Sequence, residues 1–396
     1  MKKLFALINA RIFPVAGDII ERGSILVKDG RIAAIGVNIT IPKGVMKIDL
    51  AGRSITPGFI DAHCHVGVFN EGVGEIGSDG NDATSPVTPH IKAADGIYTD
   101  DEAFIDALAH GITTLCIGPG SANVIGGQMA VVKPRSNILE EMLITDYVGL
   151  KCAFGENPKR VYGSKGTMPS TRMGVAAIMR KAFADAQNYL AKKQAHESAP
   201  AKEGEPKQPF ATEYEKEVLL EVLSGHKPLR AHAHRTDDIQ TAIRVAGEFG
   251  VRIYIEHGTE AHKIAGYLAK KGVTVIIGPL YYSKTKVELR DASMEASVIL
   301  EKAGVPFAIM TDAPVKKIGS LFDDARLCVR YGLSKETALK AVTINAAKVL
   351  GMEDRLGTLE PGKDADLVIW EGDPFDYLSK VRTTLIEGKP VWGKLG

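Results

Sequence analysis

Cysteine is scarce in this chain, with 4 residues among 396 and no CxxC pair. The four, at positions 64, 116, 152 and 328, are spread along the sequence, and three of them lie in apolar runs typical of strands. Small secreted domains held together by disulfides carry far more cysteine in a shorter chain. The pattern therefore favours reduced thiols in the core of a cytoplasmic protein.

Long apolar runs and an excess of charge are also missing. No apolar run approaches the roughly 18 residues that a membrane-spanning helix needs. The start, MKKLFALINARIF, resembles a signal peptide only as far as Ile8, because Asn9 and Arg11 interrupt the apolar stretch, and we expect a first strand there. Lys and Arg number 49 against 48 Asp and Glu, so we expect neither nucleic acid nor a membrane as a partner.

The distribution of strand and helix patterns suggests two structural parts. Residues 1–55 are short β runs broken by glycine, and the same texture returns after residue 351. Between them strands and helices alternate, which is the pattern of parallel strands joined by right-handed crossovers. About eight such units favour an α/β barrel of the (β/α)8 type, the TIM barrel, although 118–150 is too irregular to divide. We predict a barrel at 56–346 and a small β domain from 1–55 plus 347–396.

One stretch inside the barrel region has a different composition. Residues 195–211, AHESAPAKEGEPKQPFA, are rich in Pro, Glu, Lys and Ala and have no apolar periodicity. Such a segment cannot bury enough apolar surface to order itself. We predict a flexible surface insertion between two helices, without a catalytic role.

A pair of histidines ends the first strand of the predicted barrel, in PGFIDAHCHVG (57–67). Residues two apart in a strand face the same side, so His63 and His65 point together while Cys64 faces away. Two imidazoles at the C-terminal end of a barrel strand can chelate a divalent ion. Alone the pair is weak evidence, because two surface or hydrogen-bonded histidines would give the same pattern.

Three further strand ends strengthen the metal hypothesis. LRAHAHR brings a strand to His232, RIYIEHG ends one at His257, and FAIMTDAP ends one at Asp312. Histidine is scarce, with 10 in all, yet four lie at the C-terminal ends of three predicted strands. The strand ends of a barrel meet at one face, so these side chains are predicted to form one site.

These motifs resemble those of the amidohydrolase superfamily of metal-dependent hydrolases. The tail NAAKVLGMEDRLGTLEPGKDADLVIWEGDP (345–374) and the stretch GSILVKDGRIAAIG (23–36) complete the resemblance, which covers nearly the whole chain. Within the superfamily the chain is most similar to imidazolonepropionase-like and prolidase-like members. The resemblance implies a distorted (β/α)8 barrel with a small β-sandwich domain formed by both termini.

The resemblance also implies a ligand set for one or two divalent ions. His63 and His65 would bind one metal, His232 and His257 the second, and Asp312 would be the last ligand and the proton carrier. Zinc is the first expectation, and the nitrogen and oxygen ligands also accept manganese or iron.

A bridging carboxylate is expected on an intermediate strand, and VGLKCAFGENPKR (148–160) offers two candidates. Glu156 follows the strand at its C-terminal end and needs no modification, whereas Lys151 lies inside the strand and would have to be carboxylated. We favour Glu156, because site residues cluster at the strand ends. Lys151 remains the alternative.

Several further residues are candidates for contacts around the metals or with the substrate. His234 shares the face of His232 and is expected to support the ligands or face the substrate, with metal binding as the alternative. The other candidates lie in loops that follow predicted strands: Asn81, Asp82, His90, Arg160 and Tyr162. An arginine can hold a substrate carboxylate through two hydrogen bonds.

The implied reaction is hydrolysis of a carbon–nitrogen bond, in an amide or cyclic amide, by a metal-activated water. Asp312 would take the proton of the water and return it to the departing amine. Candidate substrates are small molecules: dipeptides, N-acyl amino acids or imidazolone-type rings. One alternative is deamination, although Arg235 stands where deaminases of this scaffold usually carry a glutamate. The other is a structural or assembly protein that has kept its ligands. Relatives often form homo-oligomers, which stays open here.

Overall fold

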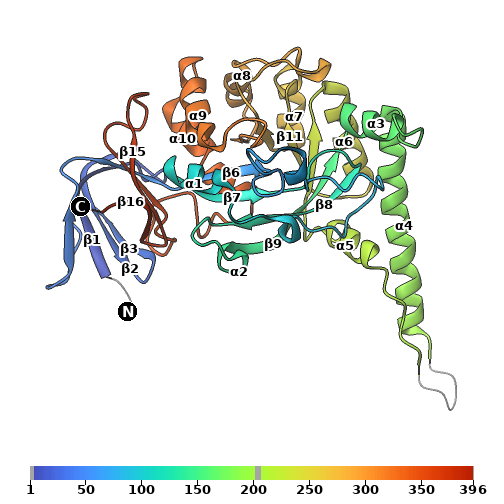
Figure 1. Cartoon of the computed structure of the whole chain (residues 1–396), viewed down its shortest axis with the longest axis horizontal. Helices are drawn as coiled ribbons and strands as arrows, with labels where there is room; N and C mark the ends of the chain where they lie inside the picture. The colour runs from blue at the N-terminus through green and yellow to red at the C-terminus, as the bar shows by residue number, and fades with distance from the viewer. Residues whose placement is uncertain (1–3, 201–206, 396) are drawn as a thin grey trace.

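The computed structural model describes residues 4–200 and 207–395. One of its two eight-stranded sheets is the barrel, in which the strand order follows the chain from the first strand to the last (Figure 1). These strands are β6 (Phe59–Cys64), β7 (Ile112–Ile117), β8 (Ile125–Val132), β9 (Leu143–Ala153), β10 (Leu229–Ala233), β11 (Ile253–His257), β12 (Val275–Ile277) and β13 (Phe307–Ile309). The backbone N–H of Asp312 donates to His63 O (3.2 Å) and that of His65 to Ala313 O (2.7 Å), so the two edges nearly close.

One strand of the barrel runs against the others. β8 pairs antiparallel with both β7 and β9, whereas the remaining pairs are parallel. The connection from β7 to β8 is a short loop without a helix, and only α2 (Leu139–Met142) separates β8 from β9. A parallel pairing would need a crossover of a dozen or more residues. The predicted α/β barrel is confirmed, and β8 is its distortion.

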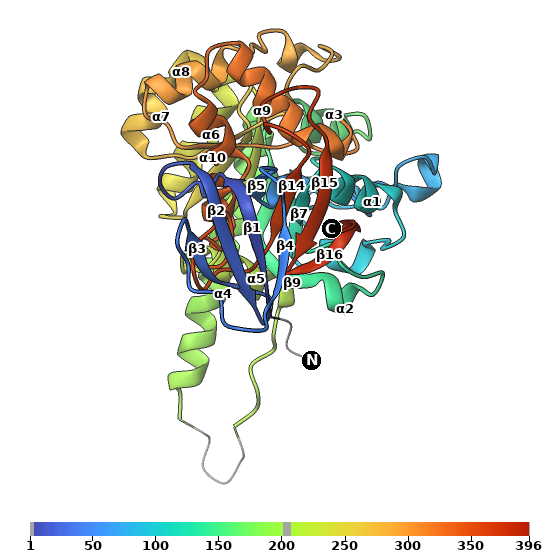
Figure 2. The same cartoon turned by 90° about the vertical axis from the view of Figure 1, so that its left-hand side faces the viewer.

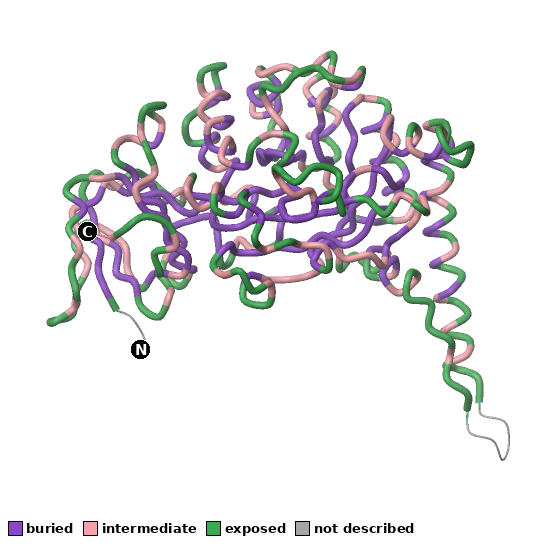
Figure 3. The backbone as a smooth tube through the Cα atoms, in the orientation of Figure 1, coloured by how far each residue is buried: buried purple, intermediate pink, exposed green. Residues whose placement is uncertain are grey.

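Helices cover the outside of the barrel, and the strands they enclose are buried along most of their length (Figures 1 and 3). The apolar side chains between the two layers form one large cluster. The helices are α1 (Glu102–Ala109), α3 (Glu156–Gly163), α4 (Arg172–Ser198), α5 (Tyr214–Leu223), α6 (Thr236–Glu248), α7 (Ala265–Lys271), α8 (Ala296–Lys302), α9 (Leu321–Arg330), α10 (Lys335–Ala341) and α11 (Ile344–Val349). Among the residues described, no helix has the length and apolarity to cross a bilayer.

The second sheet is built from both ends of the chain (Figure 2). β14 lies beside β5 in antiparallel register, with Leu367 opposite Pro57, and a separate apolar core lies against the sheet. The N-terminal strands are β1 (Leu4–Ile12), β2 (Ile20–Lys28), β3 (Arg31–Gly36), β4 (Met46–Asp49) and β5 (Ser54–Pro57), and the C-terminal ones are β14 (Leu367–Trp370), β15 (Val381–Ile386) and β16 (Lys389–Gly393). The domain boundaries at 55/56 and 346/347 stay predictions.

Helix α4 extends beyond the barrel (Figure 1). Its buried face ends at Tyr189, and the helix continues to Ser198 with exposed and half-exposed residues. The predicted insertion at 195–211 was therefore wrong at its start, because 195–198 are helical. Residues 207–211 form no regular element, and 201–206 lie outside the described residues.

Candidate metal centre and active site

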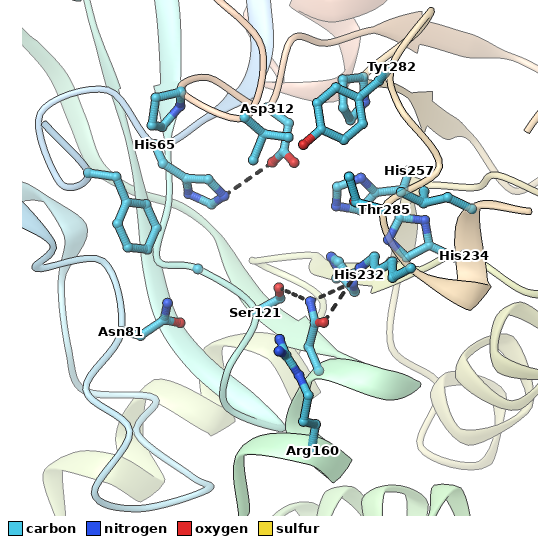
Figure 4. A pocket seen from close by; sticks show the side chains of 18 residues that line it. His65, Asn81, Ser121, Arg160, His232, His234, His257, Tyr282, Thr285 and Asp312 are labelled. Atoms are coloured by element: carbon cyan, nitrogen blue, oxygen red, sulfur yellow. Dashed lines mark hydrogen bonds and ion pairs between the residues drawn. The ribbon is translucent and has the colours of Figure 1, made fainter. Parts of the chain in front are cut away.

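A cavity of about 440 Å³ opens at the C-terminal ends of the barrel strands. Figure 4 shows His65 on one side of it, His232, His234 and His257 on the other, and Asp312 between them. Parallel strands end at one face of a barrel, which is why residues far apart in the sequence meet here.

The histidines of the first strand hold fixed orientations. His63 is completely buried beneath the cavity, and its Nδ1 lies 3.0 Å from Glu256 Oε2. Nδ1 of His65 lies 2.7 Å from Gly118 O, a contact in which the imidazole N–H donates. In each ring Nδ1 contacts another protein group and Nε2 faces the centre. Hydrogen-bond partners of metal-binding histidines commonly fix the ring in this way. Cys64 faces the apolar cluster behind the strand.

The three histidines of β10 and β11 form a compact group. One ring nitrogen from each of His232, His234 and His257 lies within 4.8 Å of the others. His257 Nδ1 lies 2.9 Å from Gly278 O, and His234 Nδ1 lies 2.7 Å from Thr259 Oγ1. His232 Nδ1 and His234 Nε2 are buried and have no hydrogen-bond partner. His234 therefore lies at the centre together with His232.

Asp312 connects the two groups of histidines. Its Oδ1 is 3.2 Å from Nε2 of both His63 and His65, and together with His63 and His257 it forms a second group with metal-binding spacing. Burial alone would raise the pKa of this carboxyl, but His257, His63 and His65 hold the pKa well below its usual range. Asp312 is therefore a carboxylate near neutral pH, able to bind a cation or accept a proton.

Lys151 reaches the same centre from inside the barrel. The side chain is 1% exposed, and its Nζ lies 3.1 Å from His63 Nε2. Burial lowers the pKa of the Lys151 ammonium. A neutral amine at this place is the form that can react with carbon dioxide.

The preference for Glu156 as the bridging residue is not supported by the structure. β9 ends at Ala153, and Glu156 is the first residue of α3, with a half-exposed side chain that does not line the cavity. A residue that follows a strand end need not face the centre, since Glu156 begins the helix that leads away from it. A lysine side chain is long enough to reach the centre from deeper in the strand, and Lys151 does so.

A buried ion pair lies below the centre, and the sequence reasoning missed it. Arg230 and Glu256 are both 0% exposed and pair with each other, and Arg230 also donates to Ala62 O (2.7 Å). Burial raises the pKa of Glu256, but Arg230 and His63 outweigh that effect and lower it. The signal was present, because charged residues inside buried strands such as LRAHA and IYIEH are tolerated only when paired.

Burial favours the neutral form of the three histidines of β10 and β11 and the turn after β10, His232, His234 and His257. It lowers the pKa of His257 to about 3, and those of His232 and His234 to well below the usual value, with neighbouring His257 adding to the effect on both. Neutral imidazole is the form that binds metals. The buried, unpartnered nitrogens and the carboxylate in one cluster fit one or two divalent cations.

The outer wall of the cavity combines apolar with polar side chains and carries two cations, Arg160 and Lys286. Of the predicted substrate-facing residues, Asn81 and Arg160 line it. Other lining residues were not predicted from the sequence. Asn157 lies in the first turn of α3, and the rest come from loops without any periodic pattern: Ser121, Tyr282, Thr285 and Lys286. No sequence signal distinguishes such loop residues from ordinary surface residues.

Three predicted residues lie outside the cavity lining. Asp82 accepts hydrogen bonds from Thr84, and His90 pairs with Glu215 (3.3 Å). The Tyr162 hydroxyl lies 2.6 Å from both Ser85 O and Asn123 Oδ1, so Tyr162 braces the loop after β6. For these three residues the structure supports no substrate contact.

Comparison with known proteins gives a consistent result. The chain matches the amidohydrolase family over residues 54–391. A crystal structure of an amidohydrolase from Thermotoga maritima is 48% identical, with a TM-score of 0.94 over 98% of this chain and 100% of that one. The imidazolonepropionase of Maricaulis maris is 28% identical over 96% of both chains. Amidohydrolase tasK of Hapsidospora irregularis is 29% identical over 90% of this chain, which spans 38% of that protein.

Proposed function

The chain belongs to the amidohydrolase family, and on that premise we propose that it hydrolyses a carbon–nitrogen bond of a small, carboxylate-bearing amide or cyclic amide with the help of one or two divalent ions. The family fixes the broader statement, that the chain is a hydrolase acting on carbon–nitrogen bonds other than ordinary peptide bonds. The convergence of buried histidines, Lys151 and Asp312 at one end of the barrel carries the proposal.

The residues that would hold the metal fall into two sets. His63, His65 and Asp312 would hold one ion, and His232 and His257 the other, with His234 as a further ligand. A bound divalent ion lowers the pKa of water toward neutrality and polarises a carbonyl oxygen. Zinc suits these ligands, and so do manganese and iron.

Asp312 is the proposed proton carrier. It is a carboxylate with Oδ1 within 3.2 Å of two imidazole nitrogens, and it lines the cavity. The carboxylate accepts the proton of the attacking water and then donates it to the departing nitrogen, acting first as base and then as acid.

Lys151 is the proposed bridging residue between the two ligand sets. Its amine nitrogen would attack carbon dioxide, forming an N–C bond and releasing one proton, which converts the side chain to a carbamate. The carbamate supplies the two oxygens that an unmodified lysine lacks. The position of Nζ beside His63 Nε2 supports this role.

The charge of the wall supports an anionic substrate. Among the described residues that line the cavity, Asp312 is the single acid, against Arg160 and Lys286. An arginine can hold a carboxylate by two hydrogen bonds. Dipeptides, N-acyl amino acids and imidazolone-type rings with an acidic side chain all meet this requirement.

Metal analysis combined with a substrate screen tests the proposal. The purified protein should contain zinc, manganese or iron, lose activity after chelation, and regain it when one of these ions is added. His232→Ala should lose most of its metal, whereas His226→Ala, an exposed histidine on the surface, should not. A protein that neither contains nor takes up metal would overturn the proposal.

Arg160→Ala tests the recognition of the acid. Loss of a charge-assisted hydrogen bond should raise KM for acidic substrates by roughly tenfold to a hundredfold while kcat changes little. The matched control is Lys159→Ala, a neighbouring cation that does not line the cavity. An equal effect on the carboxamide analogue of the substrate would remove the proposed role.

A further inference from the structure

Two walls of the cavity face each other across the barrel mouth. The loop after β12, residues 278–295, contributes Tyr282, Thr285, Lys286 and Leu289 to one wall. The start of α3 contributes Asn157 and Arg160 to the other, as Figure 4 shows for Tyr282 and Arg160. These walls carry the two cations, so their separation determines how an anion is held.

Glu288 of the β12 loop crosses to the α3 side. It lies in a short 3-10 helix (Val287–Leu289) and is 1% exposed although its neighbours on both sides are half-exposed or exposed. Its Oε1 accepts a hydrogen bond from the backbone N–H of Glu156 (2.6 Å), the first residue of α3. The first-turn N–H groups of a helix have no partner within the helix, and a carboxylate is favoured there.

A side-chain donor, Arg172, also binds the same carboxylate. Arg172, the first residue of α4, donates through Nη2 to Glu288 Oε1 (3.3 Å) and through Nε to Asp238 in α6 (3.0 Å). Asp238 is also buried. The β12 loop is thus tied to the N-terminal ends of α3 and α4, and Arg172 connects this point to the N-terminal end of α6.

Gly155 shows how closely the carboxylate approaches the backbone. Its φ is +92°, and a Cβ added there would lie 2.5 Å from Glu288 Oε1. Any side chain at this position would displace the carboxylate. The glycine is therefore needed for the close approach as well as for the left-handed backbone.

A chain of side-chain contacts leads from Glu288 to His232, one of the candidate metal ligands. Lys286 Nζ lies 3.4 Å from Glu288 Oε2 and 3.5 Å from Asn157 Oδ1. Asn157 Nδ2 donates to Ser121 Oγ (2.7 Å) and lies 3.3 Å from His232 Nε2. Glu288 is thus linked to a candidate ligand through two side chains without touching the ligand.

We propose that Glu288 is a positioning residue, which fastens the β12 loop to the N-terminus of α3 and thereby sets the separation of Lys286 and Arg160, the two cations that bind the acidic group of the substrate. The inference rests on the proposed function for its substrate. The contact between the β12 loop and α3 is a property of the folded chain, and its effect can be measured without catalysis.

Kinetics of paired substrates test the positioning role. In Glu288→Ala, KM for an N-acyl amino acid should rise about tenfold, the usual loss for one hydrogen bond to a charged group, while kcat and metal content stay near wild type. KM for the corresponding carboxamide should change less than about twofold, because it carries no charge. Glu288→Gln keeps an acceptor for the Glu156 N–H but loses the charge, so its effect should be intermediate.

The control is Glu295→Ala, which removes an exposed acid from the same loop and should behave as wild type. An equal rise in KM for the acid and the carboxamide, or the same effect in the control, would overturn the proposal. A fall in kcat with lost metal would also overturn it, since it would place Glu288 in the support of the metal ligands.

Hydrogen exchange separates this inference from the proposed function. In Glu288→Ala, the amides of 156–163 and of 279–295 should exchange faster together, with the rest of the barrel unchanged. If the wild type hydrolyses none of the substrates, Kd values of the same acid and carboxamide, measured by calorimetry, replace KM. An unchanged exchange pattern would overturn the proposal that Glu288 holds the β12 loop to α3, whatever the activity.

Discussion

His257 and Asp312 have backbones in the left-handed region, with φ of 70° and 58°. Side chains alternate along a strand, and in β11 the inward position next to His63 already belongs to Glu256. The turn of the backbone at the strand end lets the next residue, His257, reach the centre as well. Non-glycine residues adopt this conformation at a cost of about 1–3 kcal/mol, and such strain clusters at functional sites.

Replacement of Lys151 distinguishes the two bridging candidates. Lys151→Met keeps the length and the apolar stem but removes the amine, so metal content should fall and activity should drop by at least about 100-fold, the upper range for residues that merely support ligands. Glu156→Gln is the matched control and should retain both. Mass spectrometry of the native wild type should detect the added mass of one carbon dioxide. Loss of metal in Glu156→Gln but not in Lys151→Met would favour Glu156 as the bridging residue.

The thiols predict a dependence of stability on pH. Burial raises the pKa of Cys116 and of Cys328 to about 11. In the unfolded chain a thiol ionises with a pKa of about 8.5. The contribution of each buried thiol to the free energy of unfolding is therefore fully present below about pH 8.5. It is lost as the pH rises toward 11, by up to about 1.4 kcal/mol per pH unit for each thiol. Urea unfolding at pH 8 and pH 10 measures it. Cys328→Ala should show a shallower decline, and an identical decline would contradict the assignment.

At the scale of elements, the sequence predicted the parts that have a periodic pattern. The residue patterns of 101–110 and 237–249 predict helices, and α1 and α6 lie there, with each end displaced by one residue. The irregular stretch 118–150 contains β8, whose direction depends on its pairing with two neighbours and therefore on tertiary contacts. A helix pattern can be read locally, whereas strand direction cannot.

Helix α4 provides a prediction at this scale. Its buried face ends at Tyr189, so replacing 195–211 by a short Gly-Ser linker should change the free energy of unfolding by no more than about 1 kcal/mol and leave activity intact. Phe183→Ala, in the buried part of the same helix, should cost about 3–5 kcal/mol. Urea unfolding compares the two variants. Loss of activity on shortening would show that the extension contributes to the site.

For the whole molecule, the resemblance read from a few motifs is confirmed, and so are the barrel and the hydrolase class. The structure brings together His63, His65, His232, His257 and Asp312, because strand ends meet in any barrel; their binding of metal stays a prediction. Of the residues on the outer wall of the cavity, Asn81 and Arg160 were predicted from the sequence, and most of the others were not. They come from loops such as 278–295, whose conformation depends on single buried contacts like that of Glu288.

The terminal sheet gives a prediction about the intact chain. Removal of 366–396 deletes β14–β16 and exposes the edge of β5 together with the apolar core of this sheet. Such an edge is a template for aggregation, so the truncated protein should be insoluble. Removal of 389–396 takes only the outermost strand, which is mostly exposed, and should lower Tm without loss of solubility. Sedimentation and thermal melts measure both, and a soluble, active 1–365 fragment would contradict the expectation.

The pairing of β5 with β14 also matters while the protein is being made. The two strands are separated by roughly 300 residues, and at 5–20 residues per second a ribosome needs roughly 15–60 s to reach the second strand after the first. During that interval β5 can pair with β1 on one edge but has no partner on the edge that β14 later covers, and the barrel must form while this sheet is incomplete. β14–β16 therefore complete a sheet that β1–β5 began, and the open edge of β5 needs protection until β14 has been synthesised.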